Sequence, residues 1–214
     1  MIMMNKIFAI AVTGGAASGK STVCRFFTDK GIAVISLDQL SREVVLPGGQ
    51  GYIKLVEHFG TDIILADNTL DRFLLRRFIT EAPESKKIIE GIVQPEIINL
   101  MHELIYKSEQ AGESFVVVEV PLLYETGMDS LFDACILVCI DSDLQIERLM
   151  ERDGVTKEGA VSLINIQMAQ AEKKKRAEFI VENTGGRDAL FAKTEAVFEK
   201  ILEKTMNMSK SLDR

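Results

Sequence analysis

The residues with the clearest chemical meaning lie near the start of the chain, where a glycine-rich segment fits the phosphate-binding pattern Gly-x-x-x-x-Gly-Lys-Ser. Its fixed glycines let the backbone approach phosphate oxygens closely, so that successive N–H groups point into one anion-sized hollow. The helix expected after the loop adds its positive end. The segment therefore predicts a site for nucleotide phosphates, surrounded by Gly14, Gly15, Ala16, Ala17, Ser18, Gly19, Lys20, Ser21 and Thr22.

Three side chains of this loop are expected to have separate roles. We predict that Lys20 reaches the β- and γ-phosphates as a point charge, and that the Ser21 hydroxyl completes the coordination shell of a Mg²⁺ ion that keeps several waters. Thr22 can bond the α-phosphate. The alternative is a Gly/Ser-rich turn with an exposed lysine. An apolar β-branched run before the loop and a helical pattern after it favour the phosphate site.

Five apolar runs predict the strands that position this loop. Each run is apolar on both faces rather than alternating, which is typical of parallel strands covered on both sides. The intervals between the runs leave room for crossover helices. The sequence therefore predicts an α/β fold with a five-stranded parallel sheet, whose strands lie at about 7–12, 33–37, 115–118, 134–140 and 179–181.

Three of these runs end in a carboxylate, namely Asp38, Glu119 and Asp141. Ligands of open α/β sheets collect at the carboxyl ends of the strands, so such acids lie where chemistry happens. A strand-ending acid can equally cap a helix or lie in solvent. We predict a functional role for Asp38, leave Glu119 open between the two interpretations, and assign Asp141 to the structural one.

The long segment between the second and third strands has almost no strand signal. Its apolar residues recur at helical spacing over about seventy residues, which is too long for a simple crossover. Pro83 and Pro95 indicate helix starts, and Gly60 and Gly112 indicate helix ends. We therefore expect a helical insertion that builds a second binding surface.

Two basic features lie in the helical stretch before the fifth strand. Arg148 and Arg152 are four residues apart, so they project from one face of a helix. Two guanidinium groups aimed at one point suit the charge of a phosphoryl group in its transition state. The alternative is a solvated helix on which they pair with Glu147 and Glu151. The run Lys173–Arg176 is more typical of a solvated face, although one member could meet a substrate phosphate.

Composition limits the kinds of partner and cellular compartment that this protein can have. The chain has 214 residues, a net charge of −7 and 47% hydrophobic residues, which is typical of an ordinary globular protein and argues against a nucleic-acid partner. Cys24, Cys135 and Cys139 are expected to be buried thiols in a reducing compartment, and zinc would need a tighter cluster with histidine. No apolar stretch reaches the length of a membrane span, and residues 1–6 show no leader. We expect a cytoplasmic monomer or weak homo-oligomer without a membrane partner.

The order and spacing of several motifs resemble those of the dephospho-coenzyme A kinases from about residue 7 to about 187. The most distinctive is the run Pro121-Leu122-Leu123 with a glutamate after it. The motifs that carry the resemblance are the loop, Asp38 with Arg42, Phe59-Gly60, Leu70-Asp71-Arg72, Val120 to Glu125, Gln145 with Arg148 and Arg152, Gln167, and Asn183-Thr184-Gly185.

The resemblance implies a three-layer P-loop kinase fold and the last step of coenzyme A synthesis. In that reaction the γ-phosphoryl group of ATP, with Mg²⁺, passes to the ribose 3′-hydroxyl of dephospho-coenzyme A. The implied organisation is one domain with a core at about 1–50, 113–141 and 177–206, a helical coenzyme A subdomain at about 51–112 and a mobile lid at about 142–176.

Site residues also follow from the resemblance. Asp38 would take the hydroxyl proton, and Arg42 with Arg72 would hold the acceptor. Lys20 and Arg148 would act on the transferred phosphoryl group. Arg152 would close on the ATP phosphates from the lid, and Asn183 would lie by the adenine. Asp38 also ends a strand expected next to the core, within reach of a hydroxyl in line with the γ-phosphate.

Several positions depart from the family pattern. Ala17 replaces a glycine of the loop, and Glu119 and Glu178 stand where aspartates are common. Ser36 replaces an aspartate and Gln94 replaces a histidine, and both of these changes touch the acceptor side.

Two alternatives remain at this stage. One is a kinase for another small hydroxyl compound, such as a nucleoside or a shikimate-like acceptor. The other is a non-enzymatic nucleotide switch, but the chain has no Asp-x-x-Gly and no Asn-Lys-x-Asp, which a guanine-nucleotide switch would need.

Overall fold

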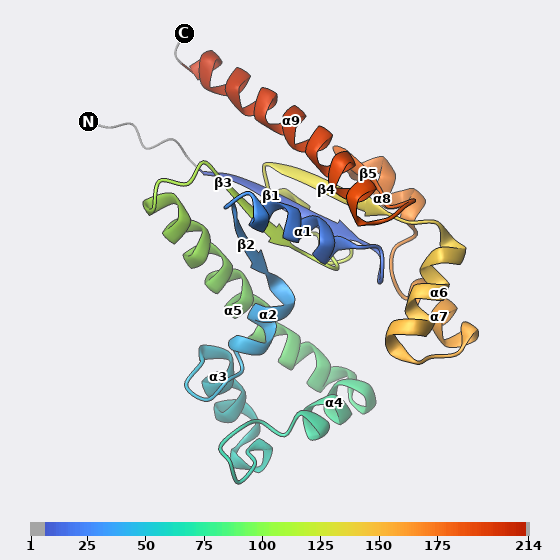
Figure 1. Ribbon diagram of the computed structural model, residues 1–214. Coiled ribbons are helices and arrows are strands. Elements are labelled where there is room, and N and C mark those ends of the chain that lie inside the picture. Colours follow the sequence, from blue (N-terminus) through green and yellow to red (C-terminus); the bar gives the residue numbers. More distant parts are fainter. Residues whose placement is uncertain (1–6, 213–214) are drawn as a thin grey trace. The chain divides into compact units, whose positions relative to one another are not determined.

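The computed structural model describes the backbone of residues 7–212 and the side chains of residues 7–206 (Figure 1). The predicted absence of a leader in residues 1–6 lies outside the described residues. The chain divides into two compact units, one formed by the residues up to Ile35 and from Ser108 onward, the other by Ser36–Lys107. The first unit contains the sheet and the phosphate-binding loop, and the second is helical.

The sheet has five strands in the order β2-β3-β1-β4-β5. The central strand β1 pairs in parallel with β3 and β4, and β4 pairs in parallel with β5. The predicted five-stranded parallel α/β fold is confirmed. The strands are β1 (Phe8–Gly14), β2 (Ala33–Ser36), β3 (Phe115–Glu119), β4 (Ala134–Cys139) and β5 (Phe179–Glu182).

The central strand is buried on both faces, because all seven residues of β1 are buried. Its alternate residues join a core formed with α1 (Lys20–Asp29) and α9 (Arg187–Leu212). Phe27 is fully buried there and meets Phe198 edge to face at a centroid distance of 5.5 Å. Burying one such side chain contributes about 1.5–3 kcal/mol. The strand that ends at the loop is therefore anchored in this core.

Three helices lie between β4 and β5: α6 (Ser142–Asp153), α7 (Lys157–Asn165) and α8 (Gln170–Arg176). Asp141 caps α6 by accepting hydrogen bonds from the amides of Asp143 and Leu144, as its structural assignment predicted. A residue in the left-handed conformation, Gly154, ends α6, and Thr156 caps α7. A short helical turn, η2 (Met128–Leu131), follows β3.

The helical unit has its own apolar core, with Leu55, Ile63, Leu70, Leu75 and Ile89 at its centre. Its predicted helix ends are confirmed in part, since Gly60 ends a helix and Pro83 begins one. The elements are α2 (Leu37–Glu43), α3 (Gln50–Phe59), η1 (Thr61–Ile63), α4 (Arg72–Glu81) and α5 (Pro83–Gln110).

The predicted helix start at Pro95 is wrong, because this proline lies inside α5. A proline removes one helical hydrogen bond and crowds the carbonyl four residues earlier, which belongs here to Gly91. Ile89 and Met101, on either side of Pro95, are both buried. Packing of these apolar residues outweighs the local preference of the proline, so the helix continues.

The three cysteines are free thiols. Cys24 and Cys139 are buried and Cys135 is half-buried, and burial raises the pKa of both Cys135 and Cys139 to about 11. Between residues 7 and 212, no helix is long and apolar enough to cross a membrane. The described residues also contain no group of three or more His, Cys, Asp or Glu side chains that could hold a metal ion.

Candidate nucleotide-binding site

The phosphate-binding loop connects β1 to α1, as the sequence predicts. Gly14 ends β1 with φ 155°, and a Cβ there would lie 2.6 Å from Ser18 Oγ and would also collide with the carbonyl oxygen of Val138. This position therefore requires glycine. Ala17 adopts a left-handed φ of 56°, a conformation that non-glycine residues adopt only at a cost.

Lys20 lies at the first position of α1 and reaches back over the loop. Its Nζ donates hydrogen bonds to the carbonyl oxygens of Gly14 at 3.1 Å and Gly15 at 2.9 Å. The ammonium group is therefore held on the loop itself, among the peptides expected to surround the phosphates. A positive charge in that position suits oxygens of a polyphosphate.

Ser21, in the first turn of α1, and Glu119, at the end of β3, come together beside the loop. The Ser21 hydroxyl donates a hydrogen bond of 2.9 Å to Glu119 Oε1. Glu119 is the last residue of β3. Its carboxylate, whose role the sequence left undecided, therefore lies next to the loop. A hydroxyl and a carboxylate oxygen are ligands that Mg²⁺ prefers in proteins.

Asn183, which directly follows β5, also contacts the loop. Its Nδ2 donates a hydrogen bond of 2.8 Å to the carbonyl oxygen of Ser18, and the residue is only 3% exposed. Its backbone N–H bonds to the carbonyl oxygen of Cys139 at the end of β4. Asn183 thus links the end of the sheet to the phosphate-binding loop.

Two glutamines bond both backbone groups of Ala16. Gln145 Nε2 donates to the carbonyl oxygen of Ala16 at 2.8 Å, and Gln167 Oε1 accepts from its N–H at 2.9 Å. Gln145 lies on α6, and Gln167 lies between α7 and α8. The family resemblance includes both residues, but their spacing in the sequence gives no sign of this shared contact.

The two arginines of α6 have different surroundings. Arg152 is exposed and pairs with its neighbour Asp153 at 2.7 Å, not with Glu147 or Glu151 as the solvated alternative supposed. Their hydrogen bonds raise the pKa of Arg152 and lower that of Asp153. Arg148 is half-buried and makes no ion pair with the residues that the structure describes. Of the two arginines of α6, Arg148 is therefore the one whose charge is not compensated by an ion pair.

The basic run of α8 is not uniformly solvated. Lys173 is only 1% exposed and its Nζ lies 2.7 Å from Glu125 Oε1, so the prediction of a solvated face is wrong for this residue. Its three neighbours are exposed, and each pairs with an acid: Lys174 with Glu182, Lys175 with Glu172, and Arg176 with Asp129.

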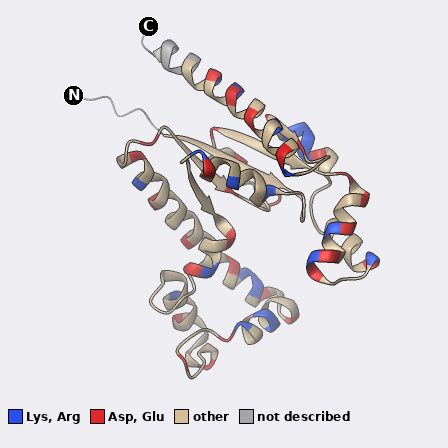
Figure 2. Cartoon of the chain, viewed as in Figure 1, with Lys and Arg blue, Asp and Glu red and all other residues tan. Residues whose placement is uncertain are grey.

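The remaining predicted site residues belong to the helical unit. Asp38 is exposed in the first turn of α2, and Arg42 is exposed in its last turn. Ser36 caps this helix through a 3.4 Å hydrogen bond from the amide of Gln39, which gives this residue a structural role. Arg72 is the first residue of α4, which also carries Arg76 and Arg77, so that much of this helix is blue in Figure 2.

Comparisons with known proteins agree with this geometry. Residues 8–188 match the family model described as dephospho-CoA kinase. A Bacillus licheniformis protein named dephospho-CoA kinase is 37% identical over 201 residues, which cover 94% of this chain and 98% of the relative. The dephospho-CoA kinase structure from Campylobacter jejuni has 25% identity and a TM-score of 0.63, and it matches 92% of this chain and 98% of its own. The crystal structure of TT1252 from Thermus thermophilus has 29% identity and a TM-score of 0.78 at the same coverage.

Proposed function

Because this chain belongs to the dephospho-CoA kinase family, we propose that it transfers the γ-phosphoryl group of ATP to the ribose 3′-hydroxyl of dephospho-coenzyme A. This is the last step of coenzyme A synthesis. The observation that carries the proposal is the loop between β1 and α1, with Lys20 held over it, inside a family match to residues 8–188. Such a loop binds phosphates through backbone N–H groups and one ammonium group.

On the ATP side, the roles follow from charge and position. The loop peptides and Lys20 bind the triphosphate. Arg148 offers an uncompensated guanidinium to the negative charge that spreads over the γ-phosphoryl oxygens in the transition state, and Arg152 adds a second once it leaves Asp153. Asn183 already supports the loop through Ser18, and its place by the adenine remains a prediction.

A magnesium ion fits the pair formed by Ser21 and Glu119. Mg²⁺ usually keeps several waters and takes only one or two protein ligands besides the substrate phosphates. The Ser21 hydroxyl would be a direct ligand, and the Glu119 carboxylate would hold a coordinated water or the ion itself. When bound, the ion neutralises phosphate charge.

On the acceptor side, Asp38 takes the proton of the 3′-hydroxyl while that oxygen attacks the γ-phosphorus and ADP leaves. Arg42 lies on the same short helix and holds the acceptor near this carboxylate. Arg72, with Arg76 and Arg77 on α4, offers positive charge that suits the pyrophosphate of dephospho-coenzyme A.

Mass-spectrometric detection of product tests this function. Incubation with ATP, Mg²⁺ and dephospho-coenzyme A should give coenzyme A, with one ADP released for each product molecule. The control is a panel of other alcohols, including nucleosides and shikimate, in the same coupled assay of ADP release. Turnover of one of those compounds without turnover of dephospho-coenzyme A would contradict the proposed acceptor.

A further inference from the structure

The peptide groups on both sides of Ala16 are held from outside the loop. Gln145 bonds its carbonyl oxygen at 2.8 Å, and Gln167 bonds its N–H at 2.9 Å. Gln145 is 7% exposed, so its donor bond is shielded from water. No other loop residue has both its N–H and its carbonyl oxygen bonded by side chains among the interactions that the structure describes.

The neighbouring glycine leaves room for this arrangement. A Cβ on Gly15 would lie 2.6 Å from Gln145 Nε2 and 3.7 Å from Gln167 Oε1. The first distance is shorter than real Cβ contacts allow, so a side chain at position 15 would push Gln145 off Ala16. The second glycine of the loop thus makes space for Gln145, while a side chain there would only touch Gln167 at an ordinary contact distance.

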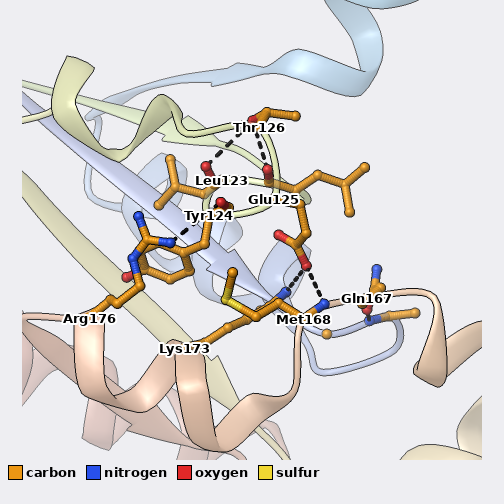
Figure 3. Close-up of polar contacts among 12 residues, drawn as sticks. Leu123, Tyr124, Glu125, Thr126, Gln167, Met168, Lys173 and Arg176 are labelled. Carbon is orange, nitrogen blue, oxygen red and sulfur yellow. Dashed lines mark hydrogen bonds and ion pairs between the residues drawn. The ribbon is translucent and has the colours of Figure 1, made fainter.

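Gln167 is itself fixed through the residue that follows it. Glu125 Oε1 accepts a hydrogen bond of 2.9 Å from the amide of Met168 and lies 2.7 Å from Lys173 Nζ (Figure 3). Lys173 is almost fully buried on α8. One carboxylate oxygen therefore ties the segment after β3 both to α8 and to the chain next to Gln167.

A second contact supports the same connection. Arg176, also on α8, donates to the carbonyl oxygen of Tyr124 at 3.5 Å, and its guanidinium lies 4.7 Å from the centre of the Tyr124 ring. It also pairs with Asp129 at 2.8 Å. Two consecutive residues after β3, Tyr124 and Glu125, are thus held by α8.

The orientation of the Ala16 peptides matters for an anion. If the carbonyl group of Ala16 turned toward the loop hollow, its oxygen would repel phosphate oxygens, whereas the bond from Gln145 holds it away. Donors and dipoles that are already in place when the substrate binds need no reorganisation during the reaction.

We propose that Gln145 and Gln167 are positioning residues that hold the Ala16 peptides for triphosphate binding, and that the Glu125–Lys173 ion pair acts through Gln167. This rests on the proposed kinase function and extends it to residues that touch neither substrate. Removing the hydrogen bond of either glutamine weakens the binding of ATP. Removing the ion pair has the same effect, because it releases Gln167.

The chain offers a matched control in Gln170. This glutamine bonds a backbone in the same way, since its Oε1 accepts from the amide of Ile140 at 3.0 Å and its Nε2 donates to the carbonyl oxygen of Ile140 at 3.0 Å. Ile140 lies after β4 and outside the loop. Gln170→Met therefore removes an equivalent pair of hydrogen bonds without touching Ala16.

The first experiment compares Gln145→Met, Gln167→Met and Gln170→Met. We expect the first two to raise the KM for ATP or lower kcat/KM for ATP about three- to tenfold, the equivalent of one net hydrogen bond, with the KM for dephospho-coenzyme A unchanged. Gln170→Met, which removes two hydrogen bonds instead of one, should lower the melting temperature at least as much but leave both KM values unchanged. Equal kinetic effects of all three, or none in the first two, would overturn the proposal.

The second experiment tests whether the ion pair acts through Gln167. Glu125→Gln retains an oxygen for the Met168 amide and loses the charge, whereas Lys173→Met leaves the carboxylate unpaired. Both should weaken ATP binding in the wild-type background and have little further effect when combined with Gln167→Met. Fully additive effects would overturn this coupling. If Lys173→Met does not fold, Glu125→Gln gives the same comparison.

Calorimetric titration with ATP separates this proposal from the proposed function. ATP binding needs no acceptor, so the variants can be ranked even if the wild type gives no product from dephospho-coenzyme A. Failure to phosphorylate that acceptor contradicts the function, whereas wild-type ATP affinity in Gln145→Met and Gln167→Met contradicts the positioning role.

Discussion

Ser21 and Glu119 are joined by a hydrogen bond of 2.9 Å that connects the first turn of α1 to the last residue of β3. If this pair holds Mg²⁺, Glu119→Gln removes the negative charge next to the ion while the side chain keeps its size. The Mg²⁺ concentration for half-maximal rate should rise roughly tenfold or more, the usual effect of losing a residue that supports a metal ligand. Initial rates measured over a range of Mg²⁺ concentrations at saturating ATP give this half-maximal concentration.

Glu178→Gln is the matched control for that experiment. Glu178 pairs with Lys204 at 2.7 Å on the surface and should leave the Mg²⁺ dependence unchanged. An unchanged Mg²⁺ dependence in Glu119→Gln would show that this carboxylate does not serve the metal ion.

Asp38→Asn should lower kcat by roughly a hundred- to ten-thousandfold, the range typical of losing a general base, because the amide cannot take up the hydroxyl proton. Binding of ATP, measured by calorimetry, should be nearly intact. Asp141→Asn is the matched control, since Asp141 also follows a strand but caps α6, and asparagine caps helices as well as aspartate does. Full activity of Asp38→Asn would remove this residue from the catalytic role.

Arg148→Ala should reduce kcat by roughly a hundred- to a thousandfold, because its half-buried guanidinium is expected to meet charge that develops in the transition state. Arg148→Lys should restore only part of this rate, since an ammonium group cannot bond two phosphate oxygens in the same planar way. Steady-state rates at saturating substrates measure both. If Arg152→Ala costs more than Arg148→Ala, the roles of the two arginines are reversed.

The Glu125–Lys173 ion pair predicts a pH effect on stability. Burial by itself raises the pKa of Glu125, but the close contact with Lys173 and the hydrogen bond from the Met168 amide outweigh it, and the net pKa is lower than that of an ordinary glutamate. A lowered pKa stabilises the folded state above the unfolded-state pKa of about 4.3, and this contribution is lost as the pH falls through the lower folded-state value. Thermal melting of the wild type from pH 7 to pH 3 should show this loss.

Glu125→Gln provides the comparison for the melting experiment. It cannot titrate, so its melting temperature should decline less steeply than that of the wild type below about pH 4.3. Parallel curves for the two proteins would mean that Glu125 does not contribute to the acid sensitivity.

The sheet could be predicted from the sequence because its signal is local. Each strand contains a short run of apolar residues without charge, and the run before Gly14 also ends at a recognisable loop. Pro95 shows where local rules fail. The helix that contains it is maintained by burial of Ile89 and Met101, which a reading of residues near the proline does not reveal.

The part of the site that lies in one continuous segment could be predicted, because each residue type there has its own chemical role. The loop, with Lys20 and Ser21, follows from a pattern in which every residue has a chemical reason. Gln145 and Gln167 bond the same residue from more than a hundred positions away in the chain, and only the fold brings them together. Lys173 was misassigned for the same reason, because its partner Glu125 follows a different strand.

Ala17 has a further consequence for how this loop can vary among related chains. Its left-handed conformation costs an alanine about 1–2 kcal/mol, while alanine in place of glycine restricts the unfolded chain and returns about 0.4–1 kcal/mol. The second effect offsets only part of the first, so alanine at position 17 is tolerated at a net cost of up to about 1–2 kcal/mol relative to glycine. A β-branched residue would be more crowded in this conformation, so position 17 favours glycine, alanine or a residue such as asparagine, which stands in the same conformation at position 68.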